Sequence, residues 1–494
     1  QTDTGNVVVN NTGTVGGSNG VVTTTGGAGA TTVVIGGQVT ANNGDGVRSL
    51  TTGGGLIDIS TSGVKSTFSG IVGLSATGDV VATTKGAVLA DSDNNGSGIG
   101  IALLSGAGDL TVNSGGTITG AQGINLSTKG TGTATVNGGG PANTITGTKD
   151  DGIHITADSG LVTVGANAGQ RFQPSVFGAG DAIEIRSAGS INVFLAGDIT
   201  GDTSGSGLGY GVIAGSTGAG AVVVVNATGG TIKGGQDGLF AGSVGAGGTA
   251  TVVNTDTINN AGFAAIVATT LDGAVTVDNK GDIATTAYGQ TSDFGIWATS
   301  GTGTLKVDNT GNIGKSGPGA GADVGGIVAW NLLGGTNTVT VNNSGAIWVD
   351  GGANGIFAVT AGTGEVLVVN KGVIDPPATG IFASGGGQVT VQTSADVTAN
   401  AVGIHAASSG IAGQSAKVDI TGGANVTALN SGGVGVEVIT TNQASAIVNA
   451  SAAGKITGGT NGITTNVSGP GTTTIDTGGQ VTGVGGDGVN AVTT

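Results

Sequence analysis

The hydrophobic residues of this chain recur in short alternating stretches, three to a repeat. One repeat reads Thr111-Val112-Asn113, then Thr117-Ile118-Thr119, then Gly123-Ile124-Asn125. Each stretch is rich in β-branched residues and bounded by Gly, Asn or Ser, which predicts a short strand followed by a tight turn. Hydrophobic residues are not spaced at 3.6 residues over ten or more positions, so helical repeat folds are excluded.

The third stretch of the repeat can be followed along the whole chain. In it a small residue precedes an Ile, Val or Leu, which we term the anchor. The anchors are Val21, Val47, Ile71, Ile101, Ile124, Ile153, Ile183, Val212, Leu239, Ile266, Ile296, Ile327, Ile356, Ile381, Ile404, Val436, Ile463 and Val489. Their mean spacing of about 27.5 residues is typical of solenoid proteins. The pattern predicts an all-β fold, a right-handed single-stranded parallel β-helix with three short strands per coil and about 18 coils, continuous over residues 1–494.

Side-chain alternation along a strand assigns the two faces of the third stretch. The anchor must point inward, because the position after it includes Arg48, His154 and Glu184, which could not line a narrow apolar interior. We expect glycines at the corners to supply positive φ angles. Asparagines that follow the first stretch are expected to stack as a hydrogen-bonded ladder. They are Asn113, Asn226, Asn254, Asn342 and Asn370.

The repeat resembles a known family of secreted proteins. Strings such as Thr340-Val341-Asn342-Asn343-Ser344-Gly345-Ala346-Ile347, followed by Gly355-Ile356-Phe357-Ala358, are similar to the pertactin-like passenger domains of Gram-negative autotransporters. The resemblance covers nearly the whole chain, and it implies export through an outer-membrane barrel to the cell surface or the medium. We expect neither the signal peptide nor the C-terminal translocator barrel within these residues.

Composition and charge narrow the classes of partner. With 107 glycines, 6 prolines and 37% hydrophobic residues, the chain fits neither disorder nor collagen. It has no cysteine, so it contains no disulfide and no thiolate metal site. A net charge of −16 argues against nucleic acid or anionic lipid as a partner. The expected partners are other copies of the chain, or a protein or glycan on a host or neighbouring cell, without direct insertion into a membrane.

Motifs for catalysis are incomplete. Asn254-Thr255-Asp256 matches one element of polygalacturonases, but no Gly-His-Gly follows it and no arginine lies downstream. The stretch 201–206 loosely resembles a serine-protease nucleophile loop, with an inserted threonine that breaks the motif. Two histidines in the chain give little material for His-based catalysis. We therefore expect no enzymatic activity, and we expect Asp256 to be solvated.

The most informative surface feature is a stripe of apolar residues at the outward position that follows the anchor. Neighbouring coils place apolar side chains there, and one residue two positions along its strand adds to them. The stripe consists of Phe240, Val267, Trp297, Val328, Trp330, Phe357 and Phe382. Contiguous exposed apolar surface usually marks an interaction site. The alternative is that a loop between coils covers the stripe and makes it a second core.

Two further segments are candidates for recognition. Residues 165–181 depart from the repeat and predict a protruding loop, with Arg171, Phe172 and Phe177 as contact residues. The alternative is that its phenylalanines fold it onto the coil. Asp91, Asp93 and Asn95 have the spacing of a calcium-binding loop, although Ala102 replaces its bidentate glutamate. A polar turn between coils would have the same residues, and no other cofactor is expected.

These observations predict a non-catalytic extracellular protein, a surface-displayed β-helical stalk that mediates adhesion or contacts within an extracellular matrix. An alternative is a fibre subunit that assembles end to end through open β-helix edges. A more distant alternative is a polysaccharide-degrading enzyme. That alternative would require a convergent cluster of carboxylates with a basic partner, and no such cluster is visible in the sequence.

Overall fold

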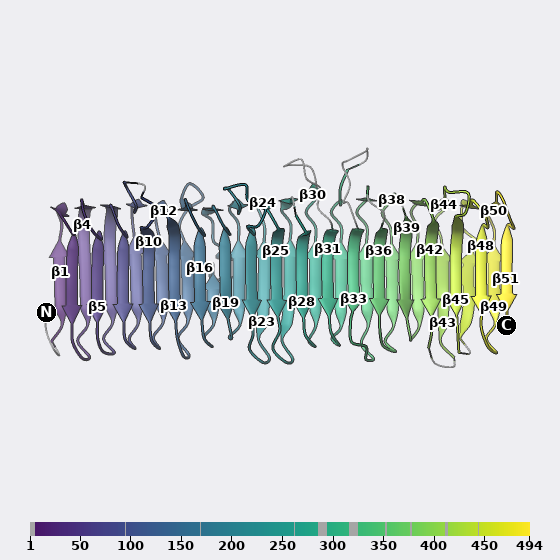
Figure 1. The fold of residues 1–494 in the computed structure, drawn as a ribbon, viewed down its shortest axis with the longest axis horizontal. Helices are drawn as coiled ribbons and strands as arrows, with labels where there is room; N and C mark the ends of the chain where they lie inside the picture. The colour runs from purple at the N-terminus through teal and green to yellow at the C-terminus, as the bar shows by residue number, and fades with distance from the viewer. Residues whose placement is uncertain are drawn as a thin grey trace. The chain divides into compact units, whose positions relative to one another are not determined.

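In the computed structural model the chain forms two compact units, Gln1–Gly245 (unit 1) and Ala246–Thr494 (unit 2). The structure describes residues 5–93, 95–167, 169–260, 262–284, 294–315, 325–350, 353–375, 378–410, 413–442 and 444–494. Within these ranges both units consist of short parallel strands stacked coil upon coil, and there is no helix (Figure 1). The units contain about 17 turns, which confirms the predicted all-β parallel β-solenoid. No described segment forms a helix with the length and hydropathy needed to cross a membrane.

Each coil of unit 1 contributes to three faces, numbered in the order in which the chain visits them. Face 1 contains β1(Val7–Asn11), β4(Thr31–Ala41), β6(Ile57–Ser66), β8(Val80–Thr84), β11(Leu110–Ser114), β14(Ala134–Gly138), β17(Val162–Val164), β20(Ile191–Leu195) and β23(Val222–Ala227). Face 2 contains β2(Val15–Gly17), the second halves of β4 and β6, β9(Val88–Leu89), β12(Ile118–Gly120), β15(Thr144–Gly147), β18(Ser175–Gly178), β21(Ile199–Thr200) and β24(Thr231–Gly234). Face 3 contains β3(Val21–Thr25), β5(Val47–Thr51), β7(Ile71–Ser75), β10(Ile99–Ser105), β13(Gln122–Thr128), β16(Ile153–Ala157), β19(Ile183–Ser187), β22(Val212–Ser216) and β25(Asp237–Ser243).

Unit 2 repeats the arrangement. Its face 1 contains β26(Thr249–Asn254), β29(Val275–Asn279), β32(Leu305–Asn309), β34(Val339–Asn343), β37(Val366–Asn370), β40(Val389–Thr393), β43(Ser415–Ile420), β46(Ser445–Ala450) and β49(Thr473–Thr477). Face 2 contains β27(Thr257–Asn260), β30(Ile283–Ala284), β35(Ile347–Trp348), β38(Ile374–Asp375), β41(Val397–Ala399), β44(Val426–Ala428), β47(Lys455–Gly458) and β50(Gln480–Gly483). Face 3 contains β28(Ala264–Thr270), β31(Phe294–Ser300), β33(Gly325–Asn331), β36(Asn354–Thr360), β39(Thr379–Gly385), β42(Val402–Ser408), β45(Val434–Thr440), β48(Ile463–Val467) and β51(Val489–Thr493).

The anchors form the inner column of face 3 in both units. Strand register places each anchor opposite the anchor of the next coil, for example Ile153 opposite Ile183, and Ile327 opposite Ile356. The anchors are buried except for Val489, which is 45% exposed. Alternation then turns the intervening side chains outward. The predicted inward direction of the anchor is confirmed, and it fixes which positions of face 3 are available at the surface.

The glycine that precedes most anchors is required by close packing. A Cβ placed on Gly123 would lie 2.3 Å from the carbonyl oxygen of Gly152 and 2.8 Å from Cγ2 of Ile145. Gly123 lies inside β13 and has no positive φ, so close packing is the reason for glycine at this position. Positive φ occurs at glycines in turns, as at Gly130 and Gly165, which agrees with the prediction for corner glycines.

A ladder of buried asparagines runs through unit 2 at the ends of the face 1 strands. Each side-chain nitrogen donates to a backbone carbonyl two residues further along the chain, at 2.8 Å. It also donates to the side-chain oxygen of the next asparagine, at 2.7 or 2.8 Å. The members are Asn254, Asn279, Asn309, Asn343 and Asn370. The last of them donates to Oγ1 of Thr393, and the predicted ladder is confirmed in this unit.

Three residues that were predicted to join the ladder lie elsewhere. Asn342 is on the outward side of its strand and donates to Oδ1 of Asp308 at 2.7 Å, while its neighbour Asn343 faces inward. Asn113 and Asn226 belong to unit 1 and are also half-buried on the outward side. For Asn342 the prediction was wrong because a run of two asparagines leaves the phase of the alternation open. Asn113 accepts a hydrogen bond from Nδ2 of Asn137 in the next coil at 3.0 Å, so stacked asparagines also bond in unit 1, on the outward side.

Candidate functional site

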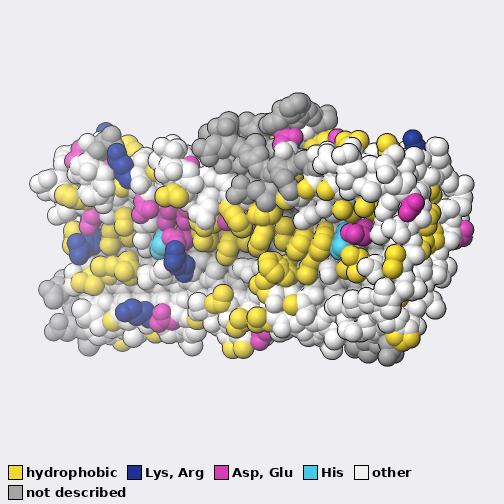
Figure 2. Space-filling view, turned by 45° about the vertical axis from the view of Figure 1, so that its right-hand side comes forward, with side chains coloured by type: hydrophobic (Ala, Val, Ile, Leu, Met, Phe, Trp, Pro, Cys, Tyr) yellow, Lys and Arg dark blue, Asp and Glu magenta, His cyan; other side chains and the backbone are white. Residues whose placement is uncertain are grey.

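The predicted apolar stripe lies on face 3. Phe240 belongs to unit 1 and the other members belong to unit 2. Its aromatic members are half-buried, whereas Val267 and Val328 are only 4% and 6% exposed. Figure 2 shows hydrophobic side chains gathered on this side of the molecule. The rings therefore keep part of their surface in solvent, and within unit 2 Val328 lies between Trp297 and Phe357 in the strand register.

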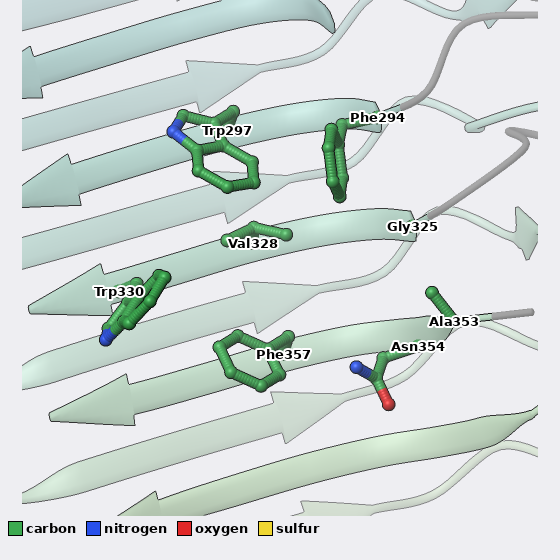
Figure 3. Close-up of a pocket in the computed structure, with 8 residues that line it drawn as sticks. All are labelled: Phe294, Trp297, Gly325, Val328, Trp330, Ala353, Asn354 and Phe357. Atoms are coloured by element: carbon green, nitrogen blue, oxygen red, sulfur yellow. The ribbon is translucent and has the colours of Figure 1, made fainter. Parts of the chain in front are cut away.

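Within unit 2 the stripe contains a pocket of about 230 Å³, formed by β31, β33 and β36 (Figure 3). Register aligns its lining in columns of one residue per coil. The columns are Phe294, Gly325 and Asn354, then Trp297, Val328 and Phe357. In each column the middle coil carries the smallest residue, so larger side chains flank it on both sides. The pocket therefore depends on Gly325 and Val328, and Trp330 and Ala353 complete its lining.

Aromatic rings stack on one another beside the pocket. The ring centroids of Phe357 and Phe382 are 5.2 Å apart with 11° between the planes, and those of Phe382 and His405 are 4.6 Å apart with 6°. Nδ1 of His405 lies 2.7 Å from Oε2 of Glu437, so a polar pair follows the stacked rings. Phe382 is stacked on both sides and so offers mainly its edge to a partner, whereas stacking covers one face of Phe357.

Phe294 was not predicted from the sequence, because it enters the stripe from a different position. Phe294 lies two residues before its anchor, and its ring centroid is 4.6 Å from that of Trp297 and 5.5 Å from that of Phe263. Asn354 occupies the same position in the pocket. Aligning the coils on their anchors would have revealed this column from the sequence.

A cluster of charged side chains lies on face 3 of unit 1, where the sequence analysis predicted none. In Figure 2 a histidine is visible among acidic and basic side chains. The cluster consists of Asp150, Asp151, His154, Asp181, Glu184 and Arg186. It forms because β16 and β19 pair in register, which brings residues on either side of two successive anchors together. Its carboxylates outnumber its cationic side chains.

His154 lies at the centre of the charged cluster. Its Nδ1 is 3.0 Å from Oδ2 of Asp151 and 2.6 Å from Oε2 of Glu184. The backbone N–H of Asp181 donates to the other oxygen of Asp151 at 2.9 Å. Nε of Arg186 donates to the other oxygen of Glu184. Each of the two carboxylates therefore has one oxygen beside the imidazole and one oxygen bonded to a separate donor.

These contacts shift the protonation of the charged cluster. Hydrogen bonds with Asp151 and Glu184 raise the pKa of His154 to about 10, so its imidazole is protonated at neutral pH. The hydrogen bond with His154 lowers the pKa of Glu184 to about 2. Burial raises the pKa of Asp181 to about 6, and burial also raises the pKa of Asp150. Glu184 is therefore stabilised in its charged form by pairing, whereas burial disfavours the charged forms of Asp150 and Asp181.

The segment 165–181 is partly folded onto the coil. It contains strand β18, and its Phe172 is fully buried, so this ring is a core side chain. Nη1 of Arg171 donates to the backbone and side-chain oxygens of Asn226, at 3.2 and 3.1 Å. Phe177 is half-buried on the outward side of β18. These placements fit the alternative in which the segment packs on the coil.

The predicted calcium ligands bond largely within their own loop. Both carboxylate oxygens of Asp91 accept from the N–H of Gly96 at 3.0 Å, and Nδ2 of Asn95 donates to Oδ2 of Asp93 at 3.0 Å. Asn94 lies outside the described residues. The contacts are those of a polar turn, and calcium binding stays a prediction.

The fragments of catalytic motifs have structural surroundings. Asn254 belongs to the asparagine ladder, and Asp256 is buried rather than solvated as we expected. The side chain of Asp202 accepts hydrogen bonds from the backbone of Ser206 and Gly207, at 2.7 and 2.8 Å. Both motifs therefore hold turns of the solenoid together.

Known proteins provide no further guide to these surfaces. Any assignment of function has to come from the apolar pocket of unit 2 and the charged cluster of unit 1. Comparison of the chain with protein-family models, curated proteins and solved structures finds no significant match.

Proposed function

We propose that this chain is a non-catalytic extracellular protein whose solenoid is a scaffold and whose apolar pocket makes adhesive contacts. The resemblance of its repeats to autotransporter passengers supports a place on the outer-membrane surface of a Gram-negative bacterium, or in the surrounding medium. The observation that carries the proposal is the pocket formed by β31, β33 and β36, because it gathers aromatic side chains at the surface of unit 2.

The pocket has the size and lining of an anchor site at a protein interface. Its volume of about 230 Å³ is below the range of about 300–1,000 Å³ that is usual for small-molecule sites. Its lining is aromatic or aliphatic apart from the amide of Asn354, and it includes no charged side chain. Buried aromatic or aliphatic anchors in such pockets contribute much of the affinity of protein interfaces.

An apolar protein side chain suits the pocket better than a sugar does. A sugar ring needs an open aromatic face and several hydrogen-bonding groups for its hydroxyls. Stacking covers one face of Phe357 and both faces of Phe382. Apart from the two tryptophans, Asn354 is the only residue lining the pocket that has a polar side chain. We therefore place a protein partner, either a second copy or a surface protein of another cell, at this pocket.

The contacts of the charged cluster support a non-catalytic chain. Oδ1 of Asp151 accepts from the N–H of Asp181, and Oδ1 of Asp181 accepts from the N–H of Tyr210 at 2.8 Å. Glu184 is bonded to His154 and to a guanidinium. These carboxylates join successive coils, and this structural role supports the proposal of a non-catalytic chain.

Surface display tests the proposal. The chain would be displayed on a non-adherent bacterial strain, and two quantities would be measured, the settling of the culture and the adherence of cells to an epithelial monolayer. We expect display to increase at least one of them. Val328→Phe fills the middle of the pocket and should lower that adherence several-fold. Val369→Phe is the control, because Val369 is likewise a valine on the outward side of its strand but is half-buried and lies on face 1.

The outcomes separate the alternatives. Adherence that Val328→Phe leaves unchanged, or no adherence at all, would overturn the proposal. Binding to polysaccharide-coated beads that Val328→Phe abolishes would place a glycan in the pocket instead. Negative-stain electron microscopy of the purified chain over a range of concentrations completes the test, because long filaments would favour the fibre alternative.

A further inference from the structure

We propose that Asp151, His154 and Glu184 form a binding site for a divalent transition-metal ion. Each side chain offers one ligand atom, and these atoms all lie within 4.8 Å of one another. Ligands about 2.1 Å from a metal ion are themselves roughly 3–4 Å apart. Nδ1 of His154 lies 3.0 Å from Oδ2 of Asp151 and 2.6 Å from Oε2 of Glu184, so the second pair would separate slightly to admit an ion. This inference is independent of the proposed adhesive function, which concerns unit 2.

The fold positions the three ligands through the register of two coils. Asp151 lies two residues before the anchor Ile153, and His154 lies one residue after it. Glu184 follows Ile183, the anchor of the next coil, and stands directly opposite His154 in the pairing of β16 with β19. The ligands therefore come from two rigid neighbouring strands and the corner that leads into one of them.

Other groups orient both carboxylates toward the imidazole. The backbone N–H of Asp181 binds Oδ1 of Asp151 at 2.9 Å, which leaves Oδ2 directed to His154. The guanidinium of Arg186 binds Oε1 of Glu184, which leaves Oε2 directed to His154. A site whose ligands are held by separate donors needs little rearrangement to bind an ion, and such supporting bonds commonly strengthen metal sites.

The donor set selects the class of ion. An imidazole nitrogen with carboxylate oxygens suits Zn²⁺, Mn²⁺ or a similar transition metal, whereas Ca²⁺ prefers oxygen ligands throughout. Three protein ligands leave positions for water on the ion. The side chain of His154 is 23% exposed, which gives an ion access from solvent. The acidic surplus of the cluster favours a cation over an anion.

Binding requires Nδ1 of His154 to release its proton to solvent, after which bonds to the ion replace the hydrogen bonds of the imidazole. The ion would occupy the region between Nδ1, Oδ2 of Asp151 and Oε2 of Glu184, while the bonds to Asp181 and Arg186 remain. Because Glu184 belongs to the coil after that of the other two ligands, the ion would also join two coils of unit 1. We therefore expect metal binding to raise the thermal stability of the chain.

The test uses the full, tag-free chain after treatment with EDTA. Isothermal titration with ZnCl₂ measures binding, and the visible absorption of added Co²⁺ reports ligation by the imidazole. We expect one saturable site and a melting temperature that rises with Zn²⁺. His154→Ala and Glu184→Gln should each weaken Zn²⁺ binding by at least about tenfold. If His154→Ala does not fold, Asp151→Asn and Glu184→Gln carry the test, because both substitutions keep the shape of the side chain.

The chain supplies its own control at His405. This residue occupies the equivalent position after its anchor, and its Nδ1 contacts a single carboxylate, that of Glu437, at 2.7 Å. His405→Ala should therefore leave Zn²⁺ binding unchanged. The proposal fails if the wild-type chain shows no saturable binding, or if His154→Ala binds Zn²⁺ as the wild type does. Either result would mean that the three side chains form an ion-pair network without a metal.

Discussion

Replacing one asparagine of the ladder tests how unit 2 is held together. Asn343 makes three hydrogen bonds inside the solenoid. Its Nδ2 donates to the carbonyl oxygen of Gly345 and to Oδ1 of Asn370, each at 2.8 Å, and its Oδ1 accepts from Nδ2 of Asn309 at 2.8 Å. Asn343→Ala removes all three bonds at a buried position without adding a group that could replace them.

The expected loss of stability follows from the groups that this substitution leaves behind. Oδ1 of Asn370 and the carbonyl oxygen of Gly345 both lose their side-chain donor, whereas Nδ2 of Asn309 keeps its bond to Gly311. A buried polar group left without a partner costs about 1–3 kcal/mol. Two such groups, with the small cavity left by the side chain, predict a loss of about 3–5 kcal/mol in the free energy of unfolding.

Urea unfolding followed by tryptophan fluorescence measures this loss. The three tryptophans of the chain, Trp297, Trp330 and Trp348, all lie in unit 2, on β31, β33 and β35, so the signal reports on the coils around Asn343. Stability is read from the midpoint and the slope of the transition.

The adjacent residue is the matched control. Asn342 is half-buried on the outward side. The one hydrogen bond found for its side chain is to the carboxylate of Asp308. Asn342→Ala should cost about 1 kcal/mol or less. If Asn342→Ala and Asn343→Ala lowered the free energy of unfolding equally, the buried ladder would have no special role in stabilising unit 2, and the reasoning would be refuted.

Three further predictions concern other parts of the solenoid. Gly123→Ala places a Cβ 2.3 Å from a carbonyl oxygen and should lower the stability of unit 1 by about 1–3 kcal/mol in thermal melting, whereas Gly215→Ala, which meets no atom within 4 Å, should lower it far less. Phe382→Ala removes a ring stacked on both sides and should lower the urea midpoint of the tryptophan signal by the equivalent of about 1–3 kcal/mol; an unchanged midpoint would contradict the stacking. Arg171→Ala removes the hydrogen bonds to Asn226 and should speed proteolytic cleavage near residue 171 several-fold, and equal cleavage rates would show that the guanidinium does not tie down this segment.

The sequence predicted the fold well because the inner positions repeat. Each anchor is an aliphatic residue after a small one, and the requirement to fill a narrow interior is the same in every coil, so the period and the inward direction could be derived without coordinates. The glycine before the anchor was also visible, but its reason was not. The close approach of Gly123 to the carbonyl oxygen of Gly152 in the next coil is a distance that only the structure shows.

The surface was predicted less completely because its side chains follow no repeat. The stripe was found from one outward column, but Phe294 comes from a second column, and the charged cluster combines both columns on two coils. His154 and Glu184 were seen as polar outward residues, yet their meeting with Asp151 depends on the register of neighbouring coils. Aligning the coils on their anchors would have placed these residues side by side before any coordinates were known.

The asparagine ladder also shows where this chain is free to vary. Its hydrogen bonds are of nearly equal length, yet successive asparagines are 25, 30, 34 and 27 residues apart in the chain. The connections between strands absorb these differences, since each coil contacts mainly its neighbours. Insertions and deletions can therefore accumulate in the turns without disturbing the inner columns. Evolution can add recognition segments at the rim of such a protein while selection preserves its interior one coil at a time.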